Sequence, residues 1–267
     1  MRRRAVVLAA FAVAAANLVP LWLVVKQAVT PERESFAWPP TWLPHALTTS
    51  NFVGAADAVP ISQGLVLSLG VALATVASTM ALALPAAWLA ARHERAGRGL
   101  DGTMVVARLF PTIAIAVPLA VIFVQLGLYN DPNGAGLWLA HTLLGLPFAF
   151  LILRAAFRGV PAELEDAARL DGAGPWTAFV RVSLPLVRPS LGAAAMLVFL
   201  VSWDEFAYAL LLQVTNRTLP PLLYYLSAFG HPGLSSAVAV LMLAPALVIL
   251  LVLEPALRSG VLAGSGR

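Results

Sequence analysis

The sequence contains no cysteine among its 267 residues and carries little charge. Without cysteine the chain forms no disulfide, and it has neither a thiol nucleophile nor a cysteine-ligated metal site. Only 11% of its residues are charged, against about 25% in ordinary soluble domains. Because 60% are hydrophobic, too few polar residues remain to cover a folded surface in water. The composition therefore predicts an integral membrane protein.

Several catalytic and binding motifs are also missing. The four histidines, His45, His93, His141 and His231, lie on separate segments without an H-E-x-x-H motif, so no metal site is expected. There is no G-x-x-x-x-G-K-[ST] phosphate loop, which excludes an ATPase of that class. There is no G-x-S-x-G nucleophile motif either. We therefore expect a chain that is not an enzyme and carries no cofactor.

Long apolar runs are what the sequence does have. A transmembrane helix needs about 20 consecutive apolar residues. Six stretches meet that length, which predicts an all-α polytopic protein with one membrane domain over residues 1–267. Prolines inside several of these stretches do not argue against spans, because neighbouring helices satisfy the freed backbone groups in membranes. The expected spans are 5–25, 64–91, 105–128, 134–157, 190–212 and 234–257.

The first apolar stretch has two interpretations. It follows Arg2, Arg3 and Arg4, as a secretory signal peptide would. However, its apolar run of about 20 residues exceeds the roughly 7–15 residues of a signal core, and no small-residue cleavage site follows. A retained span is therefore the prediction. Cleavage would leave the orientation of the other five spans unchanged.

The positions of the basic residues predict the orientation. With the N-terminus in the cytoplasm, every one of the 17 Arg and Lys residues except Lys26, Arg33 and Arg217 falls in a cytoplasmic segment. Cytoplasmic loops of membrane proteins carry such an excess. Both termini are thus expected in the cytoplasm. The arginines then lie near anionic lipid, which explains the basic pI without nucleic acid.

The cytoplasmic segment 158–189 is predicted to hold two short helices. Pro161 fits the first helical position of one, and Gly172 fits the position that ends it. A second helix is expected to begin at Pro175 and to stop before Pro185. The segment is too short to form its own core, yet it is rich in apolar residues. Two interpretations stay open: it packs on its own helix bundle, or it docks into another protein.

The same segment contains a recognisable pattern: Asp166-Ala167-Ala168, three residues, Gly172, nine residues, then Val182-Ser183-Leu184-Pro185. This resembles the EAA loop of ABC importer permeases, Glu-Ala-Ala-x3-Gly-x9-Ile-x-Leu-Pro. The spacing matches throughout. Asp166 and Val182 depart conservatively from Glu and Ile. The resemblance implies a type I ABC importer permease fold in the inner membrane.

The resemblance also implies partners and a role for the loop. In that family the loop forms a coupling helix that docks on an ATP-binding subunit, and ATP drives alternating access. The implied partners are two ATP-binding subunits that hold ATP and Mg, a second, non-identical permease and an extracytoplasmic substrate-binding protein. The implied ATPase-coupling residues are Glu165, Asp166, Ala167, Ala168, Leu170, Asp171, Gly172, Leu184 and Pro185.

A second resemblance concerns the fifth span. Ser202-Trp203-Asp204-Glu205-Phe206, followed by Tyr208-Ala209-Leu210-Leu211, resembles maltose-type carbohydrate permeases. A sugar or sugar derivative is therefore the implied substrate. Polyamine permeases have a related acidic motif, so a polyamine or another small solute stays open. A channel and an intramembrane enzyme that uses one of the two acids are further alternatives.

The two acids are also unusual on physical grounds. A charge at the bilayer centre costs at least about 2.5–3.5 kcal/mol, so intramembrane carboxylates are candidates for function. Trp203 and Tyr208 could stack on a sugar. Ordinary packing or a subunit interface would explain the same residues. The substrate-pathway candidates are Trp203, Asp204, Glu205 and Tyr208.

Overall fold

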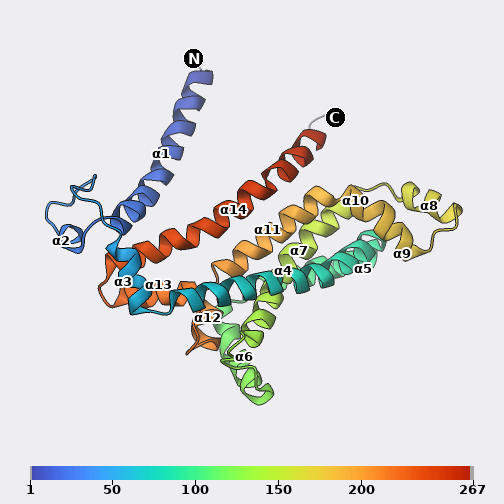
Figure 1. Cartoon of the computed structure of the whole chain (residues 1–267). Helices are drawn as coiled ribbons and strands as arrows, with labels where there is room; N and C mark the ends of the chain where they lie inside the picture. The colour runs from blue at the N-terminus through green and yellow to red at the C-terminus, as the bar shows by residue number, and fades with distance from the viewer. Residues whose placement is uncertain (1, 265–267) are drawn as a thin grey trace. The chain divides into compact units, whose positions relative to one another are not determined.

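The computed structural model describes residues 2–264, and side chains over 6–7, 9–249 and 251. All regular secondary structure in residues 2–264 is helical, which confirms the all-α prediction (Figure 1). The contacts divide these residues into two compact units. One comprises the residues up to Leu65 together with Leu219–Pro245, and the other comprises Val66–Thr218 together with the chain from Ala246.

The first unit contains α1 (Arg2–Ala28), α2 (Glu32–Ser35), α3 (Ser50–Ala58), α13 (Leu219–Ala228) and the beginning of α14 (Pro232–Gly264). The buried Asn51 of α3 closes the end of α1. Its side-chain nitrogen donates to the carbonyls of Ala28 at 3.0 Å and Thr30 at 2.8 Å. Gly233 lies against the same side chain, where a Cβ atom would come within 2.6 Å of Asn51 Oδ1. Asn51 therefore joins three helices.

The second unit holds most of the remaining helices: α4 (Ile61–Arg92), α5 (Glu94–Ala107), α6 (Thr112–Leu126), α7 (Ala135–Arg158), α11 (Arg188–Trp203) and α12 (Ala207–Leu212). α11 packs along α7, and α12 packs against α6 and α7. One apolar cluster includes Phe150, Leu153 and Phe157 of α7, all 1% exposed or less. A second includes Leu137 and Leu212. α7 contributes to both clusters and is thus the central helix of the unit.

Helices occupy all six predicted span ranges, but only four are single long helices. α1, α4, α7 and α14 each contain a stretch long and apolar enough to cross a membrane. Two bent pairs raise the number to six if each pair is one span: α5 with α6, bent by 94°, and Pro175–Leu186 with α11, bent by 80°. The described residues thus have four to six candidate spans.

The predicted third span, 105–128, is not one continuous helix. α5 ends at Ala107, and α6 begins at Thr112, directly after Pro111. Pro111 disfavours helical backbone at Phe110, so the turn after α5 does not continue into α6 as one helix. α6 has 15 residues, or about 22 Å at 1.5 Å per residue. That is shorter than a hydrocarbon core of about 30 Å.

Buried polar contacts hold α5 along α7. Arg154 of α7 is 3% exposed, forms an ion pair with Asp101 of α5, and donates from Nε to the carbonyl of Ala90 at 3.2 Å. Gly97 lies directly against the Arg154 guanidinium, where a Cβ atom would clash. The segment after α4, expected only as a cytoplasmic connection, is therefore a packed helix.

Candidate functional site

The segment between α7 and α11 forms two short helical regions at one end of these helices (Figure 1). α8 (Ala162–Leu170) is followed by α9 (Pro175–Ala178), a π-helical turn (η1, Phe179–Ser183) and α10 (Leu184–Leu186). Pro161 lies one residue before α8 and not at its first helical position. The prediction that the second helical region stops before Pro185 is wrong, because helix continues to Leu186. Leu184 N–H bonds to Phe179 O across the wide π turn, and Pro185 has no N–H that needs a partner.

Gly172 ends α8 as the sequence predicts. Its φ is +88°, a left-handed conformation that favours glycine. The N–H of Gly172 bonds to the carbonyl of Arg169 at 3.0 Å, and the N–H of Ala173 bonds to that of Ala168 at 2.9 Å. This pair of bonds is the Schellman motif. The turn between the two helical regions therefore depends on the glycine.

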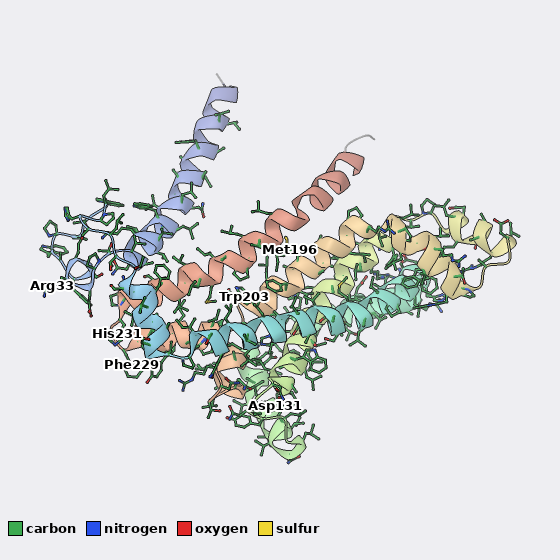
Figure 2. All side chains as sticks on the ribbon, viewed as in Figure 1. Arg33, Asp131, Met196, Trp203, Phe229 and His231 are labelled. Atoms are coloured by element: carbon green, nitrogen blue, oxygen red, sulfur yellow. The ribbon has the colours of Figure 1, made fainter. Side chains whose placement is uncertain are left out.

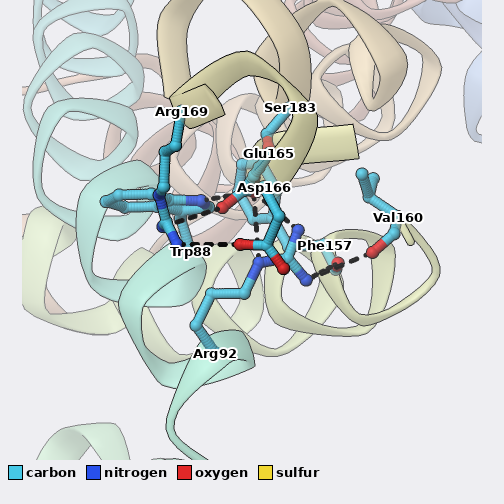
Figure 3. A network of polar contacts seen from close by, with 8 residues as sticks. All are labelled: Trp88, Arg92, Phe157, Val160, Glu165, Asp166, Arg169 and Ser183. Carbon is cyan, nitrogen blue, oxygen red and sulfur yellow. Dashed lines mark hydrogen bonds and ion pairs between the residues drawn. The ribbon is translucent and has the colours of Figure 1, made fainter. Parts of the chain in front are cut away.

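Glu165 is the centre of a buried network (Figure 3). The residue is only 2% exposed, and its Oε1 accepts hydrogen bonds from four donor atoms. Trp88 Nε1 lies at 2.9 Å, and Arg92 donates from Nε at 3.1 Å and from Nη2 at 2.6 Å. The Ser183 hydroxyl is the fourth donor. A residue predicted to contact a partner thus has its carboxylate bound inside its own chain.

Arg92 connects this network to the end of α7. Its Nη1 donates to the carbonyl of Phe157 at 3.3 Å and to that of Val160 at 3.1 Å (Figure 3). Both carbonyls lie at the end of α7 or just beyond it, where helical partners are lacking. One guanidinium on the last turn of α4 therefore contacts both α8 and the end of α7.

The network keeps Glu165 ionised. Burial alone would raise the pKa of this carboxyl, but hydrogen bonds from Arg92, Ser183 and Trp88 outweigh burial and lower the pKa from 4.5 to about 2. Since the pKa is lower in the folded protein, the stabilisation is complete above about pH 4.5 and is lost as the pH falls toward 2.

We expect the stability difference between the parent protein and Glu165→Gln to be constant above pH 4.5 and to shrink below it. Denaturation midpoints of both proteins across pH 3–7 measure this, and a pH-independent difference would contradict it.

The inner face of the segment is aromatic and buried. Phe179, 3% exposed, contacts Trp88 at a ring-centroid distance of 4.9 Å and Phe157 at 5.9 Å. Leu184 packs against the same cluster. Of the two interpretations of segment 158–189, packing on the helices of its own chain is thus correct for this inner face.

The outer face is apolar and exposed. We call Leu164, Leu170, Trp176 and Val180 the docking face; they are 44%, 90%, 62% and 40% exposed. Asp166, Ala167, Asp171 and Gly172 are exposed in the same segment, whereas Ala168 and Pro185 are partly buried. Arg169 pairs with Asp166 at 3.0 Å. Most of the predicted coupling residues are therefore exposed, whereas Glu165 is buried and Leu184 is partly buried.

The predicted fifth span, 190–212, is broken at the acidic motif. α11 ends at Trp203, which Figure 2 labels, and α12 starts at Ala207. Glu205 caps α12: its carboxylate accepts from the N–H groups of Ala207, Tyr208 and Ala209 at 2.9–3.1 Å. A carboxylate satisfies the free N–H groups at a helix start and favours the helix dipole. The expectation that Asp204 and Glu205 occupy one continuous helix is wrong.

Glu205 also contacts a buried histidine. Its Oε2 lies 3.3 Å from His141 Nε2, and His141 Nδ1 lies 2.7 Å from the Ser202 hydroxyl. His141 is 2% exposed. The contacts join α7 to the break between α11 and α12.

The other pathway candidates differ in exposure. Asp204 is exposed, whereas Trp203 and Tyr208 are 4% and 3% exposed. Trp203 stacks on Phe199 at 5.6 Å. Tyr208 borders a cavity of about 400 Å³ that also contacts Arg108 and Phe148. The structure thus does not bring the four candidates to one surface, and their contact with substrate stays a prediction.

Replacement of Glu205 tests its role in this break. Glu205→Ala removes the acceptor for three N–H groups and the partner of His141, and leaving buried donors unpaired costs about 1–3 kcal/mol. We expect a lower thermal unfolding temperature for Glu205→Ala in detergent, a smaller decrease for Glu205→Gln, and little change for the exposed Asp204→Asn. An unfolding temperature of Glu205→Ala equal to that of the parent would contradict the capping role.

Sequence reasoning missed Trp88, Arg92, Ser183 and His141. Arg92 and Glu165 are 73 residues apart, so no local pattern joins them. The sequence alone does not indicate that Glu165, and not its neighbour Asp166, is the buried acid. Within the described residues, no group of three or more His, Cys, Asp or Glu side chains could hold a metal ion.

Comparison with known proteins identifies the family of this chain. Residues 80–261 match the family model described as binding-protein-dependent transport system inner membrane component. The chain is 33% identical over 249 residues to the sulfoquinovosyl glycerol transport system permease protein of Agrobacterium fabrum, covering 91% of this chain and 86% of that protein. It is 34% identical over 230 residues to the trehalose transport system permease protein of Mycobacterium tuberculosis, covering 84% and 83%.

A solved structure shows the same fold. A chain of a bacterial ABC transporter involved in the import of the acidic polysaccharide alginate superimposes with a TM-score of 0.74 at 18% identity, covering 94% of each chain. The predicted type I ABC importer permease fold is thereby confirmed, and with several apolar helices the chain is a multi-pass inner membrane protein. The chain belongs to the family of binding-protein-dependent transport system inner membrane components.

Proposed function

We propose that this chain is the permease subunit of an ATP-driven importer and that its docking face binds a separate ATP-binding subunit. The observation that carries the proposal is that Leu170 is 90% exposed and Trp176 62% exposed. The inner face of the same segment packs on α4 and α7 of its own chain. Several large exposed apolar side chains in one short, ordered segment are typical of an interaction site. The distribution of basic residues supports a cytoplasmic location of this segment and of both termini.

The charge around the docking face indicates the chemistry of the partner surface. Glu163, Asp166 and Asp171 are exposed in α8 and at its end. Arg169 is half-exposed and is already paired with Asp166. The partner is therefore expected to present an apolar groove with basic residues at its edge, since complementary charge directs association.

The remaining partners are proposed from the resemblance to the family. ATP and Mg bind to two ATP-binding subunits, a second and non-identical permease completes the pathway, and an extracytoplasmic binding protein delivers the substrate. The substrate class is a sugar or a sugar derivative, supported by relatives that are named for trehalose, for sulfoquinovosyl glycerol and for alpha-glucosides. Movement between inward-open and outward-open states carries the substrate across the membrane.

Purification of the tagged chain from its native membrane tests this function. The expected result is a complex that contains an ATP-binding subunit and a second permease. A sugar bound to the binding protein of the same system, identified by mass spectrometry, would support the substrate class. A stable chain without an ATP-binding subunit would contradict the proposed function, and a polyamine or another solute in the binding protein would contradict the sugar assignment alone.

A further inference from the structure

Movement of a docked α8 reaches the membrane only if α8 is rigidly attached to the membrane helices. The peptide chain itself attaches α8 to α7 through the turn at 159–161 and to α11 through α9 and α10. No such short peptide connection joins α8 to α4, because 69 residues lie between the end of α4 and the beginning of α8. Any attachment of α8 to α4 must therefore be made by side chains.

The side-chain attachment between α8 and α4 is dominated by one carboxylate and one guanidinium. Arg92 binds Glu165 Oε1 through both Nε and Nη2, and Trp88 of the same helix binds the same oxygen. The Arg92 side chain is 16% exposed and the Glu165 side chain 2%. Charge-assisted hydrogen bonds are shorter and stronger than neutral ones, so two of them to one carboxylate oxygen hold α8 close to α4.

The second half of the guanidinium fixes α4 to α7. Arg92 Nη1 binds the carbonyls of Phe157 and Val160, so the three helices meet at one planar group (Figure 3). Guanidinium is suited to this role because its donors lie in a rigid plane, whereas a lysine ammonium would act as a single point charge. Ser183 extends the connection to the turn before α10, since its hydroxyl binds the same Glu165 oxygen.

We infer that Arg92 is a positioning residue for transport: through Glu165 it makes α4 and α7 move as one body with α8 when the ATP-binding subunit moves the loop. The inference rests on the proposed function. It assigns to Arg92 the transmission of movement from the docking face to α4. The docking face is assigned the contact with the partner, whereas the Arg92 guanidinium is bound by Glu165 and by the carbonyls of Phe157 and Val160.

Spin-label distances measure this transmission. The chain has no cysteine, so Glu163→Cys and Leu82→Cys, at exposed positions of α8 and α4, provide the only two labels on this subunit. The distances are recorded in the purified complex without nucleotide and with ATP trapped. In the parent complex we expect the mean distance to change by less than about 2 Å, the size of small helix shifts. In Arg92→Gln and in Glu165→Gln, which keeps the shape of the side chain, we expect ATP to change it by more than about 2 Å.

A purely structural role would give a different result. It would broaden the distances between the two labels equally with and without ATP, and this outcome in both variants would overturn the inference.

Arg92→Lys keeps the charge and one contact. The ATP-dependent change in its label distance should therefore lie between those of the parent and Arg92→Gln. Glu94→Gln, which removes an exposed ion pair with Arg158, is the matched control and should behave as the parent. If the parent complex contains no ATP-binding subunit, the proposed function fails and the inference fails with it; an intact complex with unchanged variants overturns the inference alone.

Discussion

Leu170→Asp is expected to release the ATP-binding subunits from the complex. Leu170 is the most exposed side chain of the docking face, at 90%, and a buried charge without a partner at an interface centre costs several kcal/mol. Substitution of a hot-spot residue costs about 2 kcal/mol or more, and we expect the introduced charge to give Leu170→Asp a cost of this size. We therefore expect the amount of co-purified ATP-binding subunit to fall at least about tenfold, because 1.4 kcal/mol corresponds to a factor of ten. Quantitative mass spectrometry of the purified complex measures this ratio.

A matched control separates docking from general effects of an added charge. Leu47 is also an exposed leucine, at 76%, but it lies in a segment predicted to be extracytoplasmic. Leu47→Asp should leave the ATP-binding subunits bound. Equal subunit ratios in Leu170→Asp and the parent would show that the docking face is not the contact.

Removal of either partner from the Arg92–Glu165 pair is expected to destabilise the chain strongly. The pair is nearly buried, and removal of one partner from a buried ion pair typically costs about 3–5 kcal/mol because the other charge is left unpaired. Glu165→Ala should therefore lower the thermal unfolding temperature of the complex much more than an average substitution. The measurement is a thermal denaturation curve in detergent or in lipid nanodiscs.

The exposed Glu94–Arg158 pair provides the comparison. Its two side chains are 54% and 52% exposed with a separation of 3.1 Å. Surface ion pairs contribute about 0–1 kcal/mol. Glu94→Ala should thus change the unfolding temperature little. If Glu94→Ala and Glu165→Ala were equally destabilising, the network around Glu165 would not be the attachment that the structure indicates.

Periodicity and length predicted much of the fold because membrane helices are long and uniformly apolar. For this reason α4, at Ile61–Arg92, and α7, at Ala135–Arg158, lie close to the predicted ranges 64–91 and 134–157. The breaks at Pro111 and at Asp204–Phe206 were not predicted, since a proline or an acid inside an apolar run is compatible with either a continuous or a broken helix. The difference is decided by tertiary contacts, such as those of Glu205 with His141.

The coupling segment shows the same limit. Pro161, Gly172 and the alanines specify a short helix and its end from local chemistry, and α8 follows that pattern closely. Local chemistry does not show which acid turns inward. Glu165 and Asp166 are neighbours, yet Glu165 is buried under Arg92 while Asp166 is exposed. That difference depends on the position of α4, 73 residues earlier in the chain.

Uptake by the reconstituted complex tests the central claim most directly. The purified complex is placed in liposomes with its binding protein outside, and uptake of the solute found on that protein is measured with and without ATP inside. We predict uptake only when both ATP and the binding protein are present, and none from liposomes that contain this chain alone. Uptake by the chain alone, without ATP, would contradict the account and identify a channel.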